Sequence, residues 1–216
     1  MSLRPPYISI LESTVRCGSR TATLTRRDVE LFYLLGSAGR CVASTYLADA
    51  LFPDADAADA ENRLHVAVHR FRRRCGEPRV ICRDRFGYRT GDGVRCDLDD
   101  IEADFRACAG AAGLDDTQLA RASDAYARLV ASPFVAAAGT SPIGIAIAAR
   151  VAALLRRLGD CIARDQLRRG RYDSALSFAR GAIERDGCDE SPLEIFHPRA
   201  ARRLNARGSD TTVRTP

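Results

Sequence analysis

A chain of 216 residues has room for two small domains and can bury hydrophobic cores without help from metals or disulfides. All 33 basic residues are arginine, and the formal net charge is only +5, which excludes a histone-like polycation. The distribution of charge is more informative, because residues 60–96 contain ten arginines and only four acidic residues. We therefore expect any strongly basic surface to lie in this segment.

The cysteines and the apolar segments indicate in which cellular compartment the protein is expected. The eight cysteines form no Cys-x2-Cys pair and have no histidine at a metal-ligand spacing, so we expect free thiols and no metal site. The sequence starts without the apolar run of a signal peptide. The longest apolar stretch, residues 143–155, is interrupted by Arg150 and is too short to span a bilayer. We expect a cytoplasmic protein with no membrane partner.

The N-terminal segment predicts short strands. Residues 7–11 and 21–24 are rich in β-prone side chains. Residues 17–20 contain a glycine and a serine and predict a turn between the two runs. We expect a small hairpin or meander here.

Two helices are predicted next. Thr25 and Asp28 have the spacing of a capping box, and apolar residues then recur at helical spacing, so a first helix should begin here and end within residues 36–39. A second, short helix is predicted with Ser44 as its N-cap, and Pro53 should end it.

A third helix is predicted over residues 62–75, after an acidic, alanine-rich connection at residues 55–59. Its apolar side chains share one face, and a glycine follows its last residue. These apolar residues are Leu64, Val68, Phe71 and Cys75. On a wheel of about 100° per residue, the opposite face and its flanks carry Asn62, Arg63, His65, Val66, His69, Arg70 and Arg73, and Arg74 lies beside the apolar stripe.

A basic β-hairpin is predicted after this helix. Residues 79–83 and 87–90 are β-prone, and a second turn precedes a last strand near residues 94–96. The hairpin carries Arg83, Arg85 and Arg89.

The remainder of the chain is predicted to be helical, which gives a fold class of an α+β N-terminal domain followed by an all-α domain. We expect an N-terminal domain over residues 1–97, a helical domain over residues 98–206 and a disordered polar tail over residues 207–216. Apolar periodicity places the helices at residues 98–108, 117–130, 145–167, 172–184 and 200–205. A tight connection at residues 169–171 suits an antiparallel helix pair.

The third helix has the side chains that reading duplex DNA requires. Arginine can bind guanine through two hydrogen bonds, asparagine can do the same for adenine, and a valine can contact a thymine methyl group. The hairpin arginines could reach the adjacent minor groove. The predicted DNA-binding residues are Asn62, Arg63, His65, Val66, His69, Arg70, Arg73, Arg74, Arg83, Arg85 and Arg89. An equally open alternative is that this charge is only the solvated face of an amphipathic helix.

Order and spacing along residues 24–89 resemble the OmpR/PhoB-type winged helix-turn-helix. The resemblance is carried by Leu24-Thr25-Arg26-Arg27-Asp28, Gly39-Arg40-Cys41-Val42, the run from Asn62 to Arg74 and Gly87-Tyr88-Arg89. It implies that the initial strands form a small sheet, that the third helix enters the major groove and that residues 79–96 form the wing.

The following residues resemble the bacterial transcriptional activation domain of SARP-type regulators, with its tetratricopeptide-like helices. This resemblance is carried by Asp97-Leu98-Asp99, Ala125-Tyr126, Ser132-Pro133-Phe134 and Gly170-Arg171-Tyr172-Asp173. It implies a transcription activator that binds promoter DNA in the nucleoid, contacts RNA polymerase and can self-associate through its helical domain.

Other functions find less support in the sequence. There is no G-x-S-x-G elbow and no phosphate-binding glycine loop, so we expect no enzyme, no catalytic residue and no cofactor. The carboxylates at residues 186–190 lack the twelve-residue calcium-loop pattern. Cys75 could be a redox sensor, but its place on the apolar stripe favours a buried structural cysteine. The alternative to DNA binding is a protein-interaction scaffold whose winged helix contacts proteins.

Overall fold

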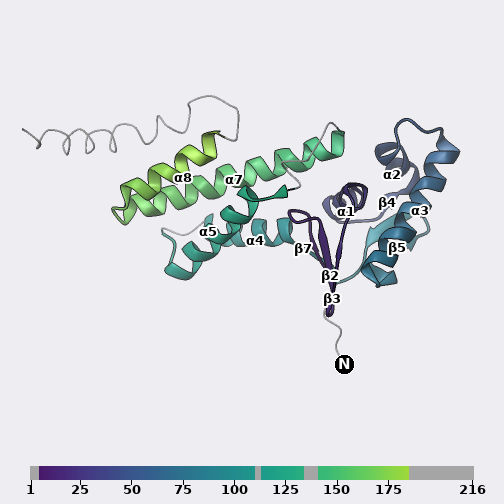
Figure 1. Cartoon of the computed structure of the whole chain (residues 1–216), viewed down its shortest axis with the longest axis horizontal. Coiled ribbons are helices and arrows are strands. Elements are labelled where there is room, and N and C mark those ends of the chain that lie inside the picture. Colours follow the sequence, from purple (N-terminus) through teal and green to yellow (C-terminus); the bar gives the residue numbers. More distant parts are fainter. Residues whose placement is uncertain (1–4, 110–112, 134–140, 185–216) are drawn as a thin grey trace, which may run out of the picture. The chain divides into compact units, whose positions relative to one another are not determined.

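The computed structural model describes residues 5–109, 113–133 and 141–184, and it shows a mixed α and β chain in which small sheets and short helices come first and long helices follow (Figure 1). The described residues form two compact units. Residues within 1–106 and 127–151 make up the first unit, and residues within 107–126 and 152–216 make up the second. The predicted domain boundary after residue 97 stays a prediction.

A four-stranded sheet opens the first unit, with the strand order β3-β2-β1-β7. The strands are β1 (Tyr7–Ser9), β2 (Thr14–Cys17), β3 (Arg20–Thr23) and β7 (Arg95–Cys96). The first three form an antiparallel meander, whereas β7 runs parallel to β1. The predicted meander is confirmed, although β1 ends at Ser9, two residues before the expected end, and β2 lies between the two runs that the sequence indicated.

Helix α1 (Arg26–Ala38) begins and ends as the sequence predicts. The Thr25 hydroxyl accepts a hydrogen bond from the Asp28 backbone N–H, and the Asp28 carboxylate accepts one from the Thr25 N–H at 2.8 Å. At the other end Gly39 adopts a left-handed conformation, which glycine tolerates best. The capping box and the end of this helix are therefore confirmed.

The next two helices differ from the prediction at their N-termini. Helix α2 (Ser44–Leu51) follows the two-residue strand β4 (Val42–Ala43), and its N-cap is Ala43, so the prediction of Ser44 as the cap was wrong. Helix α3 (Ala57–Cys75) begins five residues before the expected start. The Asp56 carboxylate caps it by accepting a hydrogen bond from the Asp59 N–H at 2.9 Å, so the supposed connection at residues 55–59 is mostly helix.

A second sheet has the strand order β4-β6-β5. A short 3-10 turn (Pro78–Val80) leads into β5 (Ile81–Asp84), which pairs with β6 (Gly87–Thr90) as a hairpin with a two-residue turn. The hairpin predicted over residues 79–96 is therefore shorter than expected. Residues 95–96 belong to the first sheet instead, because β7 finds its partner in β1.

Helix α4 (Asp97–Ala109) starts at a buried carboxylate. Asp97 is fully buried, and it accepts hydrogen bonds from the Ser9 hydroxyl at 2.6 Å and from the backbone N–H groups of Ile10 and Leu11. These bonds tie the start of α4 to the end of β1. The first unit also includes the beginning of α7 (Pro142–Arg168), where Arg150 pairs with carboxylates of α4.

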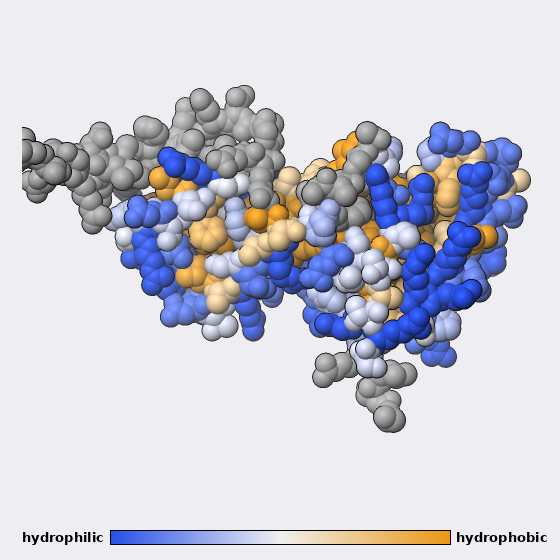
Figure 2. Space-filling model, in the orientation of Figure 1, coloured by the Kyte–Doolittle hydropathy of each residue, from blue (hydrophilic) through white to orange (hydrophobic). Residues whose placement is uncertain are grey.

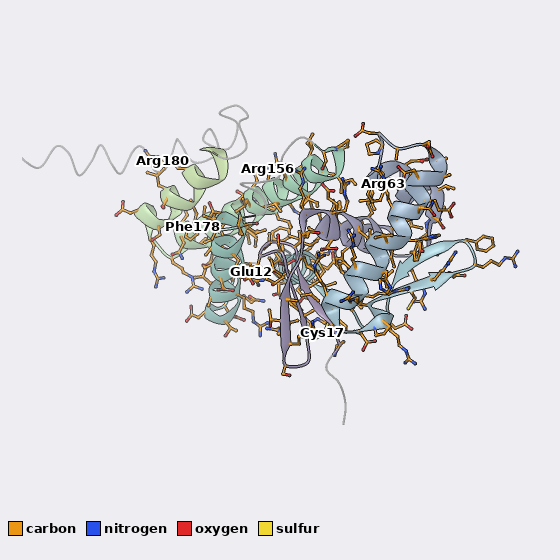
Figure 3. All side chains as sticks on the ribbon, turned by 45° about the vertical axis from the view of Figure 1, so that its right-hand side comes forward. Glu12, Cys17, Arg63, Arg156, Phe178 and Arg180 are labelled. Carbon is orange, nitrogen blue, oxygen red and sulfur yellow. The ribbon has the colours of Figure 1, made fainter. Side chains whose placement is uncertain are left out.

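The second unit is helical. It contains most of α5 (Asp116–Val130), the C-terminal part of α7 and α8 (Tyr172–Glu184), and α8 folds back along α7 in Figures 1 and 3. The rings of Tyr126 and Phe178 meet edge to face with centroids 5.2 Å apart. The predicted helices at 98–108, 117–130, 145–167 and 172–184 are confirmed to within three residues at each end, and the predicted helix at 200–205 lies outside the described residues. No helix among the described residues is long and apolar enough to cross a membrane.

Candidate nucleic-acid interface

The inner side of α3 is an apolar stripe that fixes the helix in the first unit. All four residues of the predicted stripe are buried, and Ala60 extends it by one turn toward the N-terminus. The Phe71 ring is stacked parallel to the Phe32 ring of α1, with centroids 6.3 Å apart. This packing orients the helix, so that the position of its opposite face is determined by the core.

The outer side of α3 is a straight row of exposed residues. Asn62, Val66, His69 and Arg73 follow one another at intervals of four, three and four residues, and all four are exposed. The row is about 16 Å long at 1.5 Å per residue. Arg70 is exposed beside it. The residues predicted to face outward therefore do so, and a row of this length and a helix of this width fit a major groove about 12 Å wide.

The arginines of this helix differ in their partners. Within the described part of the chain, Arg70 and Arg73 have no ion-pair partner. Arg63, labelled in Figure 3, pairs with Asp59 one turn earlier at 2.6 Å. His65 is half-buried, and its ring lies edge to face with the Tyr88 ring of β6, with centroids 6.4 Å apart. The unpaired charge is thus concentrated in the C-terminal half of the helix.

Two further arginines of α3 point toward the protein. Arg74 donates a hydrogen bond to the Asp28 carboxylate of the α1 capping box. Arg72 donates from two guanidinium nitrogens to the Ile81 carbonyl, at 2.8 and 3.0 Å, which ties α3 to the hairpin. Of the predicted DNA-binding residues, Arg74 is therefore the one that the structure places against α1 and away from the exposed row.

The hairpin presents its arginines in three different settings. The Arg83 guanidinium lies over the Tyr88 ring at 6.0 Å, and that of Arg85 lies over the Phe86 ring at 4.8 Å. Arg89 is paired with Asp92 at 2.7 Å. Figure 3 shows the hairpin projecting beside α3, and in Figure 2 hydrophilic side chains cover much of the face over α3 and β5. Arg83 and Arg85 consequently extend the unpaired positive charge of α3.

Phe86 is a residue that the sequence reasoning missed. It occupies the turn of the hairpin with 69% of its side chain exposed. Only the pairing of Asp84 with Gly87 shows that Phe86 lies in a two-residue turn, where its side chain is directed away from the core.

The Cys75 thiol lies at the C-terminal end of α3 and is almost fully buried. Burial raises the pKa of Cys75 to about 12, and this effect outweighs the opposite influence of Arg74. A reactive cysteine needs a lowered pKa, so the nearby arginines do not activate this thiol. The thiols of six cysteines are free, those of Cys17, Cys41, Cys75, Cys82, Cys96 and Cys161. Among the described residues no group of three or more metal-ligating side chains could hold a metal ion.

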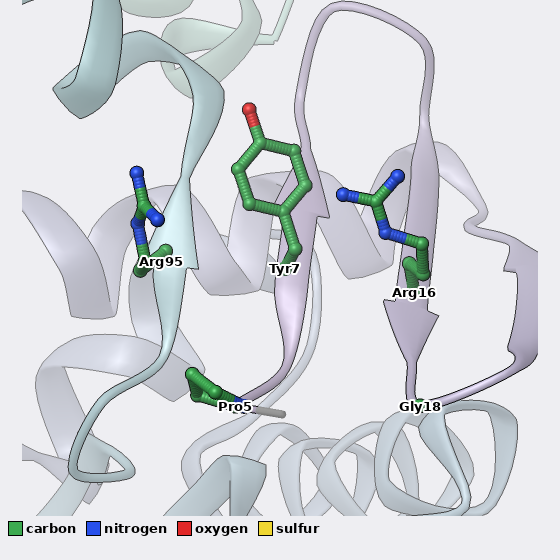
Figure 4. A pocket seen from close by; sticks show the side chains of 5 residues that line it. All are labelled: Pro5, Tyr7, Arg16, Gly18 and Arg95. Atoms are coloured by element: carbon green, nitrogen blue, oxygen red, sulfur yellow. The ribbon is translucent and has the colours of Figure 1, made fainter. Parts of the chain in front are cut away.

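A second candidate region is a hollow of about 540 Å³ on the outer face of the first sheet (Figure 4). Tyr7, Arg16 and Arg95 line it side by side, because strand register pairs Tyr7 with both arginines. Arg16 lies over the Tyr7 ring at 5.1 Å, and Arg95 is paired with Asp100 at 2.9 Å. Sequence reasoning missed this cluster because its members come from three strands. With one arginine neutralised, it is a weaker anion site than α3 and the hairpin.

Comparison with known proteins adds no assignment, since no model of a known protein family matches the chain and no curated protein gives a significant match.

Proposed function

We propose that residues 7–96 form a winged helix-turn-helix that binds duplex DNA, and that the chain is a sequence-specific transcription regulator. In this proposal α2 and α3 are the two helices of the motif, α3 enters the major groove, and the β5–β6 hairpin is the wing. The order of elements and the dense packing of α2 against α3 support the assignment.

The observation that carries the proposal is where the unpaired arginines lie. Arg70, Arg73, Arg83 and Arg85 have no ion-pair partner among the described residues, and all four are exposed on α3 or on the adjoining hairpin. Acids pair with Arg63 in the N-terminal half of α3, with Arg74 on its inner side and with Arg89 of the hairpin. The outer side of the C-terminal half of α3 and the tip of the hairpin keep their positive charge, which supports binding of a polyanion.

Base reading is assigned to the exposed row of α3. Asn62 and Arg73 can each make two hydrogen bonds to a base edge, and Val66, which is 47% exposed, offers an apolar contact to a thymine methyl group. The remaining unpaired arginines would hold phosphates, which fix the register of the protein on DNA without reading sequence.

The test is selection from a random duplex library followed by fluorescence anisotropy with the recovered duplexes. Replacing both Arg70 and Arg73 with alanine should weaken binding at least about tenfold and reduce sequence preference. The matched control replaces Arg63 and Arg89, which are already neutralised by Asp59 and Asp92, and should change affinity much less. Recovery of no preferred sequence, or equal effects of the two double variants, would argue against specific DNA binding and favour the protein-interaction scaffold.

The helical residues after Asp97 are proposed to contact RNA polymerase or a second copy of the chain. Their described part offers one exposed large apolar side chain on α7, Ile145, which is 57% exposed. Sedimentation of the chain alone and with RNA polymerase distinguishes the two proposals, and an Ile145→Asp variant tests whether this surface takes part.

A further inference from the structure

The tip of the β5–β6 hairpin combines an exposed aromatic ring with a cation. Phe86 is the most exposed of the described large apolar side chains, at 69%, and its neighbour Arg85 lies over the ring at 4.8 Å. The turn contains only these two residues, because Asp84 and Gly87 on either side of it pair with each other. The tip thus offers a partner both an aromatic surface and a positive charge.

The tip stands on a rigid support. The Gly87 backbone lies so close to β4 that an added Cβ would be 1.8 Å from the Val42 carbonyl oxygen. Tyr88 is buried, with 3% of its surface exposed. Arg72 of α3 donates a hydrogen bond to the Ile81 carbonyl at the base of the hairpin. The position of Phe86 relative to the outer face of α3 is therefore fixed by the core and by direct hydrogen bonds.

The positive charge near the tip of the hairpin indicates which kind of partner would bind there. Arg85 lies over the Phe86 ring and Arg83 lies over the Tyr88 ring, and neither arginine has an ion-pair partner among the described residues. The Asp84 carboxylate accepts a hydrogen bond from the Arg85 backbone N–H. An apolar protein pocket would have to desolvate both guanidinium groups, whereas a nucleic acid supplies phosphates for them and stacked bases for the ring. A nucleic acid satisfies both requirements, and under the proposed function that partner is duplex DNA.

We propose that Phe86 is a wedge that inserts from the minor groove between two stacked base pairs next to the segment read by α3, while Arg85 and Arg83 bind the flanking phosphates. This inference rests on the proposed function. Apolar side chains that enter a base step unstack it and bend the duplex, and pyrimidine–purine steps such as TA open most easily. The hairpin thereby favours sites that have a flexible step at a fixed distance from the α3 contacts.

The experiment uses the full chain and duplexes recovered by selection, with 2-aminopurine replacing adenine at each TA step and a dye pair at the two ends. Unstacking brightens 2-aminopurine, and bending raises energy transfer between the dyes. Phe86→Ala should abolish both signals and weaken binding about tenfold, whereas Phe86→Leu, which keeps an apolar wedge, should retain them. Because the side chain is exposed, both variants should melt at the temperature of the parent.

The outcomes separate this inference from the proposed function. If the parent chain binds its selected duplexes and Phe86→Ala binds with unchanged brightening and bending, the wedge is refuted and DNA binding stands. If the parent selects no duplex, the proposed function is refuted and the wedge with it. Loss of both signals in Phe86→Ala, with base preference along the α3 contacts preserved, supports the wedge.

Discussion

The Gly87→Ala substitution should break the connection between β4 and the hairpin. A Cβ at this position would lie 1.8 Å from the Val42 carbonyl oxygen, 2.7 Å from the Val42 carbonyl carbon and 2.9 Å from the Ala43 Cα. All three are backbone atoms, so no side chain can rotate away to make room. The strands would have to separate by more than about 1 Å, which two short backbone pairings cannot survive. We expect the free energy of unfolding to fall by about 3 kcal/mol, from lost backbone hydrogen bonds and looser packing around Tyr88.

Urea unfolding followed by circular dichroism measures this loss. The matched control is Gly36→Ala in α1, where the added Cβ would lie 3.9 Å from the Phe32 ring, an ordinary contact. Alanine is also the better helix former, so the control should be stabilised by about 0.5 kcal/mol. A Gly87→Ala chain within about 0.5 kcal/mol of the parent would show that β4 does not approach Gly87 in this way.

Three further effects follow from other contacts of the first unit. Thr25→Ala removes one half of the α1 capping box and should lower the free energy of unfolding, measured in urea, by about 1 kcal/mol. A Thr25→Ser chain keeps the hydroxyl and should retain most of this stability. Asp97→Asn should lower the free energy of unfolding by about 2 to 4 kcal/mol. The buried carboxylate accepts hydrogen bonds from the Ser9 hydroxyl and the Ile10 N–H, and an amide would turn its own N–H toward one of these donors. Thermal melts of the two chains measure the difference. Burial raises the pKa of Cys75 from 9.0 to about 12, so its contribution to stability is complete below pH 9 and is lost as the pH rises toward 12. Unfolding measured below and above pH 9 should therefore show a smaller alkaline loss for Cys75→Ala than for the parent.

Local signals in the sequence were sufficient to locate the helices, but not to place every helix start. The capping box at Thr25 and Asp28 involves residues three apart, and the apolar stripe of α3 repeats within a few turns, so both could be predicted without knowing the fold. The start of α3 was misplaced because the alanine-rich segment before it looks like a linker, while one carboxylate, that of Asp56, makes it the first turn of the helix. The strand expected near residues 94–96 is present as β7, but its sheet could not be predicted because its partner, β1, lies far away in the sequence.

The same distinction applies to the candidate site. Helical periodicity alone placed Asn62, Val66, His69 and Arg73 on one exposed row, and the structure agrees. Arg74 was included with them because its partner Asp28 lies 46 residues earlier, and no spacing rule connects the two. The exposure of Phe86 depends on the length of the turn, which becomes clear only when Asp84 and Gly87 are seen to pair.

Salt dependence can show which arginines act on DNA. Arg63 and Arg89 are neutralised by acids three or four residues away, and Arg74 by a distant one, so each would have to give up a partner before it could bind a phosphate. Six arginines of residues 60–96 have no ion-pair partner among the described residues, namely Arg70, Arg72, Arg73, Arg79, Arg83 and Arg85. If only these six release counterions, the logarithm of the binding constant should fall with the logarithm of salt concentration at a slope of about 5. If all ten arginines of residues 60–96 act, the slope should approach about 9. Anisotropy titrations over a range of salt concentrations measure this slope, and a value near the upper figure would refute the claim that pairing decides which arginines bind.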